Sequence, residues 1–86
     1  MPEISRFYGI IITLNFGDHN PPHFHIRYGK FKAAMEIRTG ALIAGVLPPK
    51  CLALVAEWVA LHRGELLEDW ELACAHKPLK KIKPLE

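Results

Sequence analysis

The chain has 86 residues, of which half are hydrophobic and 23% are charged, and its formal net charge is +2. This composition is typical of a folded globular domain and excludes a disordered or coiled-coil protein. A chain of this length forms one domain, residues 1–86, with a small core, so a homo-oligomer is one way for it to bury more surface. The longest apolar run, around residues 51–56, is far shorter than the roughly 18–20 residues that span a bilayer, so we expect no membrane partner.

Several signals of a secreted or nucleotide-binding protein are absent from the sequence. Cys51 and Cys74 lie inside apolar helical patterns, without CxxC spacing and without a secretory segment upstream. We therefore expect both to be reduced core thiols in a cytoplasmic protein. No phosphate-binding glycine loop, dinucleotide fingerprint, nucleophile elbow or HExxH motif is present, which argues against nucleotide hydrolysis and Rossmann chemistry.

The segment 8–47 predicts an antiparallel meander of about four strands. From Tyr8 the chain is rich in β-branched residues, and Ile10, Ile12, Leu14 and Phe16 alternate with Gly9, Ile11, Thr13 and Asn15, which predicts a strand. The next residues, 17–22, hold several turn formers and two prolines without a backbone donor, so they predict a loop. The alternation then resumes over 23–28 and 31–38, which predicts two more strands.

A two-residue turn at Gly29-Lys30 joins these two strands in a predicted hairpin. The register that follows places Arg27 directly opposite Lys32 and gathers the apolar side chains on the other face. A fourth strand is expected over 41–47. Side chains on the polar face of the hairpin should therefore lie close together.

Two helices over about 49–76 and a basic tail, 77–86, complete a predicted α+β fold. Proline suits the first turn of a helix, and Pro48-Pro49 opens this region. Gly64 is expected to end the first helix, and the acidic residues after it favour the start of a second. Both helices would pack on one face of the sheet, with the tail extended or forming a short edge strand.

The chemistry-bearing side chains concentrate between Asp18 and His25. Imidazole is both the acid or base of physiological pH and the commonest metal ligand. In the predicted register His23 and His25 project from the same polar face of one strand, with Glu36 opposite His23. Asp18 and His19 lie at the mouth of the preceding loop. This segment is therefore the first candidate site.

Three interpretations of this segment stay open at the level of sequence. His19, His23 and His25 could ligate zinc or another transition metal with one coordination position left open. Alternatively, Asp18 caps the turn and the histidines satisfy backbone groups left unpaired by the prolines. In the third interpretation His23 and His25 are catalytic without a metal, as general acid or base in RNA cleavage.

The polar sheet face is the second candidate site. Like charges opposed across strands, such as Arg27 and Lys32, are destabilising unless an anion or a partner's carboxylates lie between them. With Arg38 farther along, and Phe7 and Tyr8 near in sequence, this face could bind RNA through phosphate contacts and base stacking. It could equally be a solvated face that prevents edge pairing. The candidate binding residues of both regions are Asp18, His19, Arg27, Lys32, Glu36 and Arg38.

Four segments carry a resemblance to a known family: residues 1–10, the His-Pro-Pro-His block at 18–25, 58–70, and 82–85. On these segments the chain resembles the small prokaryotic family called domain of unknown function 4160. The resemblance carries no established catalytic residues. The chain departs from the family's pattern at positions 41, 44 and 51, away from the His block.

The resemblance also implies a partner. Genes of this family often lie beside a gene for a domain-of-unknown-function 2442 protein, an arrangement proposed to be a toxin–antitoxin pair. We therefore expect a component of such a pair that binds a small cognate protein and binds or cleaves RNA through its His-bearing basic face. The alternatives are a non-enzymatic binding module, as antitoxin or adaptor, and a His-ligated metal-binding protein. Whether the protein is an enzyme stays open.

Overall fold

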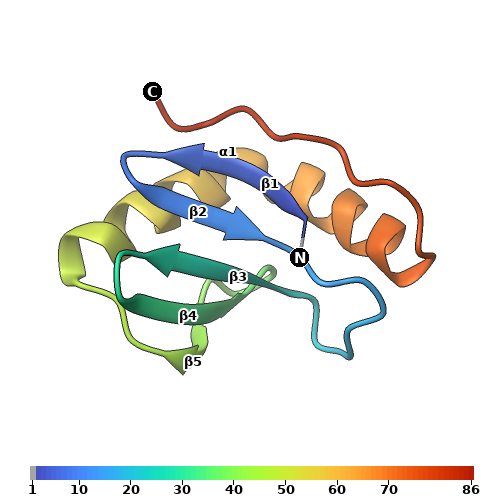
Figure 1. Cartoon of the computed structure of the whole chain (residues 1–86), viewed down its shortest axis with the longest axis horizontal. Coiled ribbons are helices and arrows are strands. Elements are labelled where there is room, and N and C mark those ends of the chain that lie inside the picture. Colours follow the sequence, from blue (N-terminus) through green and yellow to red (C-terminus); the bar gives the residue numbers. More distant parts are fainter. Residues whose placement is uncertain (1) are drawn as a thin grey trace.

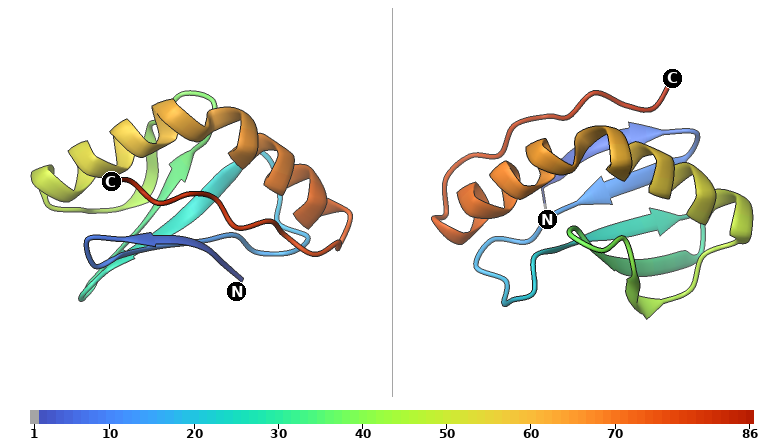
Figure 2. Two further views of the ribbon diagram at one scale, coloured as in Figure 1. Left: turned by 90° about the horizontal axis from the view of Figure 1, so that it is seen from above. Right: turned by 180° about the vertical axis from the view of Figure 1, so that it is seen from behind.

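A computed structural model describes residues 2–86 and has an α+β fold with one sheet and one helix (Figure 1). The elements are β1 (Glu3–Phe7), β2 (Ile10–Thr13), β3 (His23–Tyr28), β4 (Phe31–Glu36), β5 (Leu42–Gly45) and α1 (Pro49–Cys74). The strands are all antiparallel and neighbour one another in chain order, so the predicted meander is confirmed. The helix lies across one face of the sheet (Figure 2).

The core fills the space between α1 and the sheet. Phe24 and Met35 from the sheet and Trp58 and Leu66 from the helix are fully buried. The register of β3 and β4 is the predicted one, because Arg27 pairs with Lys32 across the hairpin. His25 and Arg27 of β3 therefore point to the face opposite the core, called here the open face.

The sheet has five strands where the sequence predicted about four, because β1 was missed. Its pairing with β2 shifts register between Glu3 and Ser5, which marks a β-bulge. Ile4 and Ser5 are consequently both buried although they are adjacent. The bulge breaks the two-residue alternation on which strand prediction rests, so the segment carried no clear strand pattern.

The helix is single and kinked, where two helices were predicted. The backbone departs from helical geometry at His62, with φ −126° and ψ 21°, and Gly64 lies inside α1 instead of ending it. Glycine disfavours a helix interior by only about 1 kcal/mol. Trp58 and Leu66 on either side of the kink enter the same core, and their burial outweighs that cost. Within residues 2–86, no helix has the length and apolar character needed to cross a membrane.

Three strand ends and one thiol also differ from expectation. The first predicted strand stops at Thr13, three residues early, and the second hairpin strand stops at Glu36. Arg38 therefore lies in the turn after β4 and not on the sheet face. The last strand ends at Gly45, whose φ is +75° and where a Cβ would collide with the backbone of Lys32. Cys74 is exposed, although a core position was predicted.

The C-terminal tail is extended and runs beside β1 (Figure 1). Ile82 and Leu85 are buried, and the backbone N–H of Ile82 donates to the carbonyl of Ile4 at 2.8 Å. The indole N–H of Trp58 donates to the carbonyl of Lys83 at 2.9 Å. The tail therefore covers one edge of the sheet and closes the core on that side.

Candidate functional site

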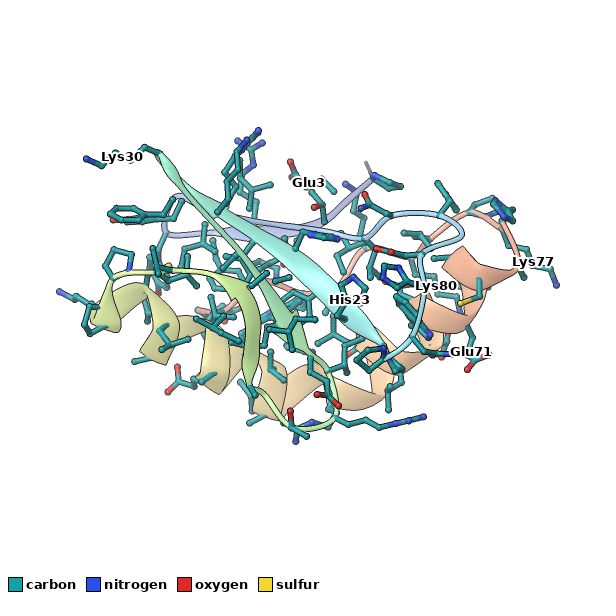
Figure 3. All side chains as sticks on the ribbon, turned by 90° about the horizontal axis from the view of Figure 1, so that it is seen from below. Glu3, His23, Lys30, Glu71, Lys77 and Lys80 are labelled. Carbon is teal, nitrogen blue, oxygen red and sulfur yellow. The ribbon has the colours of Figure 1, made fainter. Side chains whose placement is uncertain are left out.

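Three side chains from the loop after β2 and from β3 meet at one corner of the sheet. His23 and His25 are two residues apart on β3 and so share one side of the strand. The Nε2 atoms of these histidines lie 3.0 Å and 3.4 Å from Oδ2 of Asp18. Figure 3 shows His23 at the end of the sheet beside the C-terminal part of α1, far from the hairpin tip marked by Lys30.

The environment of His23 fixes which ring nitrogen faces Asp18. Nδ1 lies 2.8 Å from the carbonyl oxygen of Pro21, which can only accept, so Nδ1 carries a proton. The side chain is buried and its ring lies against Trp70, with centroids 5.3 Å apart. In the neutral ring Nε2 therefore has a lone pair, and it lies 3.0 Å from Oδ2 of Asp18, close enough for the two atoms to share a cation.

The carboxylate of Asp18 is oriented by the residue that follows it. Its Oδ1 accepts the backbone N–H of His19 at 2.9 Å and lies 2.9 Å from His19 Nδ1, which leaves Oδ2 to the histidines of β3. Burial raises the pKa of Asp18, but hydrogen bonds from His19 and His25 and the charge of His23 outweigh it, so the pKa falls to about 2. The carboxylate is therefore ionised at neutral pH.

The spacing of these atoms fits a small metal ion. Ligands at the roughly 2.0–2.1 Å typical of zinc with nitrogen or oxygen are separated by about 3.3–3.4 Å in a tetrahedron. The oxygen-to-nitrogen distances of 3.0 and 3.4 Å lie close to that value, and all three potential ligand atoms lie within 4.8 Å of one another. Because the His25 side chain is 30% exposed, the cluster is reachable from solvent.

Several predicted site residues lie outside this group of three ligands. The His19 side chain is 91% exposed and contacts only the outer oxygen of Asp18, so Asp18 takes the place that the sequence gave to His19. Glu36 does pair with His23 in the register, but among the described residues it is not part of the ligand group. One neighbour was missed: the amide nitrogen of Asn15 lies 3.1 Å from His25 Nε2.

A second feature, the cationic row, adjoins His25 on the open face and consists of Arg27 and Lys32. Among residues 2–86, no carboxylate lies within salt-bridge distance of either cation. Both line a hollow of about 260 Å³ that His25 also lines, together with Glu3, whose carboxylate pairs with Arg6. Arg27 is two residues from His25 on β3, which places the row about 7 Å away along the strand.

The aromatic residues expected on this face lie elsewhere. Phe7 is buried in the core, with its ring centroid 5.4 Å from that of Trp58. Tyr8 is exposed but lies in the turn between β1 and β2, where it lines a different hollow. The open face therefore offers cations for phosphate contacts, without the predicted aromatic platform for stacking bases.

The tail lysines are mostly engaged within the chain. The ammonium of Lys80 pairs with Glu68 at 2.6 Å, and that of Lys83 with Glu86 at 3.2 Å. Lys81 donates to the carbonyl of Glu3 at 2.7 Å. The contacts of Lys80 and Lys81 join the tail to α1 and β1, so the cationic row is the better candidate for an anion site.

Comparison with known proteins places the chain in a family. The family model described as a domain of unknown function, DUF4160, matches residues 9–71. The chain therefore belongs to this family, as its sequence indicated. The match contains the cationic row and the cluster of Asp18, His23 and His25, called here the His corner, and it stops before the tail. Neither a curated protein nor a solved structure matches the chain.

Proposed function

We propose that the protein binds a transition metal of the zinc class through Asp18, His23 and His25 and uses it to hydrolyse a phosphate ester. The observation that carries the proposal is the carboxylate oxygen held 3.0 and 3.4 Å from two imidazole nitrogens. Two histidines and a carboxylate leave a coordination position for water or substrate, as in catalytic zinc sites. A bound metal would supply a hydroxide nucleophile and a Lewis acid.

The surroundings support a ligating role for His23. A metal-bound histidine usually donates its other ring N–H to a carbonyl or carboxylate, which fixes the ring and its tautomer. The bond from His23 Nδ1 to Pro21 has this form. The contact of His19 with the outer oxygen of Asp18 orients the third ligand in the same way.

The substrate class follows from the cationic row. Arg27 and Lys32 stand opposite each other without a carboxylate between them, an arrangement that an anion would stabilise. Guanidinium and ammonium groups are the usual phosphate ligands in proteins. Because His25 lines the same hollow, a phosphate held by this row would lie beside the proposed metal. The proposed substrate is the phosphodiester backbone of RNA.

Elemental analysis of the untagged protein, followed by calorimetric titration with Zn²⁺, tests the metal. About one equivalent of metal is expected, and the double variant His23→Ala/His25→Ala should lose it. The matched control is His76→Gln, because His76 is an exposed histidine outside the cluster. A parent protein that neither contains metal nor binds added Zn²⁺ would overturn the proposal.

Cleavage of a short single-stranded RNA tests the substrate class separately. The variant Arg27→Ala/Lys32→Ala should keep its metal and lose at least tenfold in cleavage rate. Lys30→Ala is the matched control, since Lys30 is an exposed cation at the hairpin tip. If metal binds but the cationic-row variant cleaves RNA as fast as the parent, the metal site stands and the substrate assignment fails.

A second candidate function, binding of the small cognate protein implied by the resemblance, is favoured by the outer edge of β5. This strand ends the sheet, and residues 41–47 contain no charged side chain. Ile43 and Val46 are 46% and 67% exposed. Free edges are usually protected by charge or by a covering segment, as the tail covers β1. We propose that a strand of the cognate protein pairs here.

Co-purification of the two co-expressed proteins tests this interface. Ile43→Lys should abolish co-purification, whereas Leu61→Lys, at a residue 66% exposed on α1, should not. Co-purification that survives Ile43→Lys would contradict the β5 interface. Sedimentation of the chain alone gives a further outcome: self-association that Ile43→Lys abolishes would assign the edge to a second copy instead.

A further inference from the structure

A second hollow, called here the tyrosine pocket, lies at the end of the sheet away from the His corner. Its volume is about 380 Å³, and its lining comes from two turns of the sheet and the start of α1: Tyr8, Ile10, Tyr28, Pro48, Lys50, Cys51 and Leu54. Ile10 and Cys51 are buried and form an apolar floor. Neither the proposed metal site nor its substrate uses any of these residues.

Tyr8 is held in an unfavourable backbone conformation beside this pocket. It forms a two-residue turn with Gly9, and φ is positive at both positions, +49° and +79°. Turns of this type favour asparagine or glycine, and a bulky residue there is a genuine outlier. The Tyr8 side chain is nevertheless 59% exposed, so the free energy gained by burying it does not offset the strain of this backbone conformation. Such backbone outliers concentrate at ligand sites. We therefore interpret Tyr8 as a residue that contacts a ligand and does not stabilise the fold.

Tyr28 provides the second aromatic side chain of the pocket. It pairs with Ile10 in the sheet, and a Cβ on Gly9 would lie 3.5 Å from its ring. The Tyr28 ring therefore packs over the turn that carries Tyr8. Both tyrosines stand above an apolar floor, and such a pocket takes an apolar ligand body with its polar group at the rim.

The rim of the pocket carries positive charge without a counterion. No carboxylate lines it, and among residues 2–86 none lies within salt-bridge distance of Lys50. Lys50 lies in the first turn of α1, where a cation opposes the helix dipole. The rim is therefore complementary to an anionic group.

We infer that the tyrosine pocket binds a small flat aromatic molecule that carries one carboxylate or phosphate group. The ring would contact Tyr8 and Tyr28 over the apolar floor, and the anionic group would pair with Lys50. The volume is at the lower end of the range for small-molecule sites, which suits one or two fused rings and not a protein segment. This inference does not depend on the metal site.

Titration of the chelator-treated protein with 2-naphthoate, followed by amide and side-chain NMR, tests the inference. Shifts are expected at Tyr28, Cys51 and Leu54. The uncharged analogue 2-naphthalenemethanol should bind at least tenfold more weakly. Lys50→Met should remove that preference, because it removes the cation and keeps an unbranched apolar stem of similar length. Arg27→Ala is the matched control for anion binding elsewhere and should leave the shifts unchanged.

Tyr8→Gly separates ligand binding from folding. Glycine adopts positive φ without strain, so the thermal midpoint should stay equal or rise, while affinity for 2-naphthoate should fall at least tenfold. Two results would overturn the inference: naphthoate that produces no shifts at the pocket, and undiminished affinity in Tyr8→Gly. Phosphate-bearing and carboxylate-bearing naphthalenes compared on the parent then identify the preferred anionic group.

Discussion

Two carboxylates, the partly buried Asp18 and the buried Asp69, have opposite environments. Oδ1 of Asp18 lies against two nitrogens of His19, its Oδ2 lies 3.0 and 3.4 Å from the imidazoles of His23 and His25, and its pKa falls to about 2. Asp69 accepts one bond, from the backbone N–H of Lys80, and its Oδ2 has no hydrogen-bond partner among the described residues. Burial, together with the charges of Glu68 and Glu65, raises its pKa.

The difference separates a ligand-binding carboxylate from a structural one. The fold stabilises negative charge at Asp18 and surrounds it with groups that can share a cation, which is the property of a metal ligand. At Asp69 burial disfavours the charged form, and the side chain positions the tail by accepting a hydrogen bond from the backbone N–H of Lys80. Burial alone therefore does not identify a functional acid in this protein, whereas the donors around it do.

The largest expected effect comes from removing the apolar contact that holds the tail over Asp69. Ile82 is 3% exposed, and Ile82→Ala should reduce the free energy of unfolding by about 2–4 kcal/mol through lost burial and a residual cavity. Urea unfolding measures it, with Lys77→Ala as the control at an exposed tail position. A loss below about 1 kcal/mol would mean that the tail is held mainly by polar contacts such as that of Asp69.

Replacing each carboxylate with its amide should change stability in opposite directions. At neutral pH in metal-free protein, Asp18→Asn should lower the free energy of unfolding by about 1–2 kcal/mol, because a stabilised charge is lost. Asp69→Asn should leave it unchanged or raise it by up to about 1 kcal/mol, because a penalised charge is lost while Oδ1 still accepts. If both variants lost stability, or both gained it, the proposed contrast between the two carboxylates would be wrong.

The pH dependence of the free energy of unfolding tests whether ionisation of each carboxylate stabilises or destabilises the fold. The folded pKa of Asp18 is about 2 against an ordinary 3.8, so its stabilising effect is present above pH 4 and is lost as the pH falls toward 2. Asp69 has a raised folded pKa, so its ionisation lowers stability as the pH rises above 3.8. Urea unfolding between pH 2.5 and 7 gives the free energy of unfolding as a function of pH. The contribution of each carboxylate to that pH dependence should disappear in the matching asparagine variant.

The smallest effect is expected at the outer side of Asp18. His19→Ala removes the imidazole contact to Oδ1 but keeps the backbone N–H, so Zn²⁺ affinity should fall by about tenfold, the lower end of the range for a partner of a ligand. Calorimetric titration measures this change beside that of His25→Ala, which should lose at least a hundredfold as a direct ligand. Equal losses in the two variants would place His19 among the ligands, as the sequence suggested.

The sequence predicted the fold where local patterns were regular. The two-residue alternation and the Gly29-Lys30 turn placed Arg27 opposite Lys32 without further information. Prediction was wrong at β1, where a bulge interrupts the alternation, and at Gly64, where packing on both sides keeps the helix continuous. In each case tertiary structure, the bulged strand pairing or the packing of the helix on the sheet, departed from the local pattern.

For the candidate site, the residue types and the shared side of His23 and His25 followed from the sequence alone, because strand periodicity fixes them. The identity of the third potential ligand, Asp18 or His19, did not follow from the sequence. It depends on how the loop 17–22 turns back over β3, which places one oxygen of Asp18 against the histidines and leaves the His19 ring in solvent. Only the tertiary structure decides this, because loop conformation follows from contacts made across the fold and not from the periodicity of the chain.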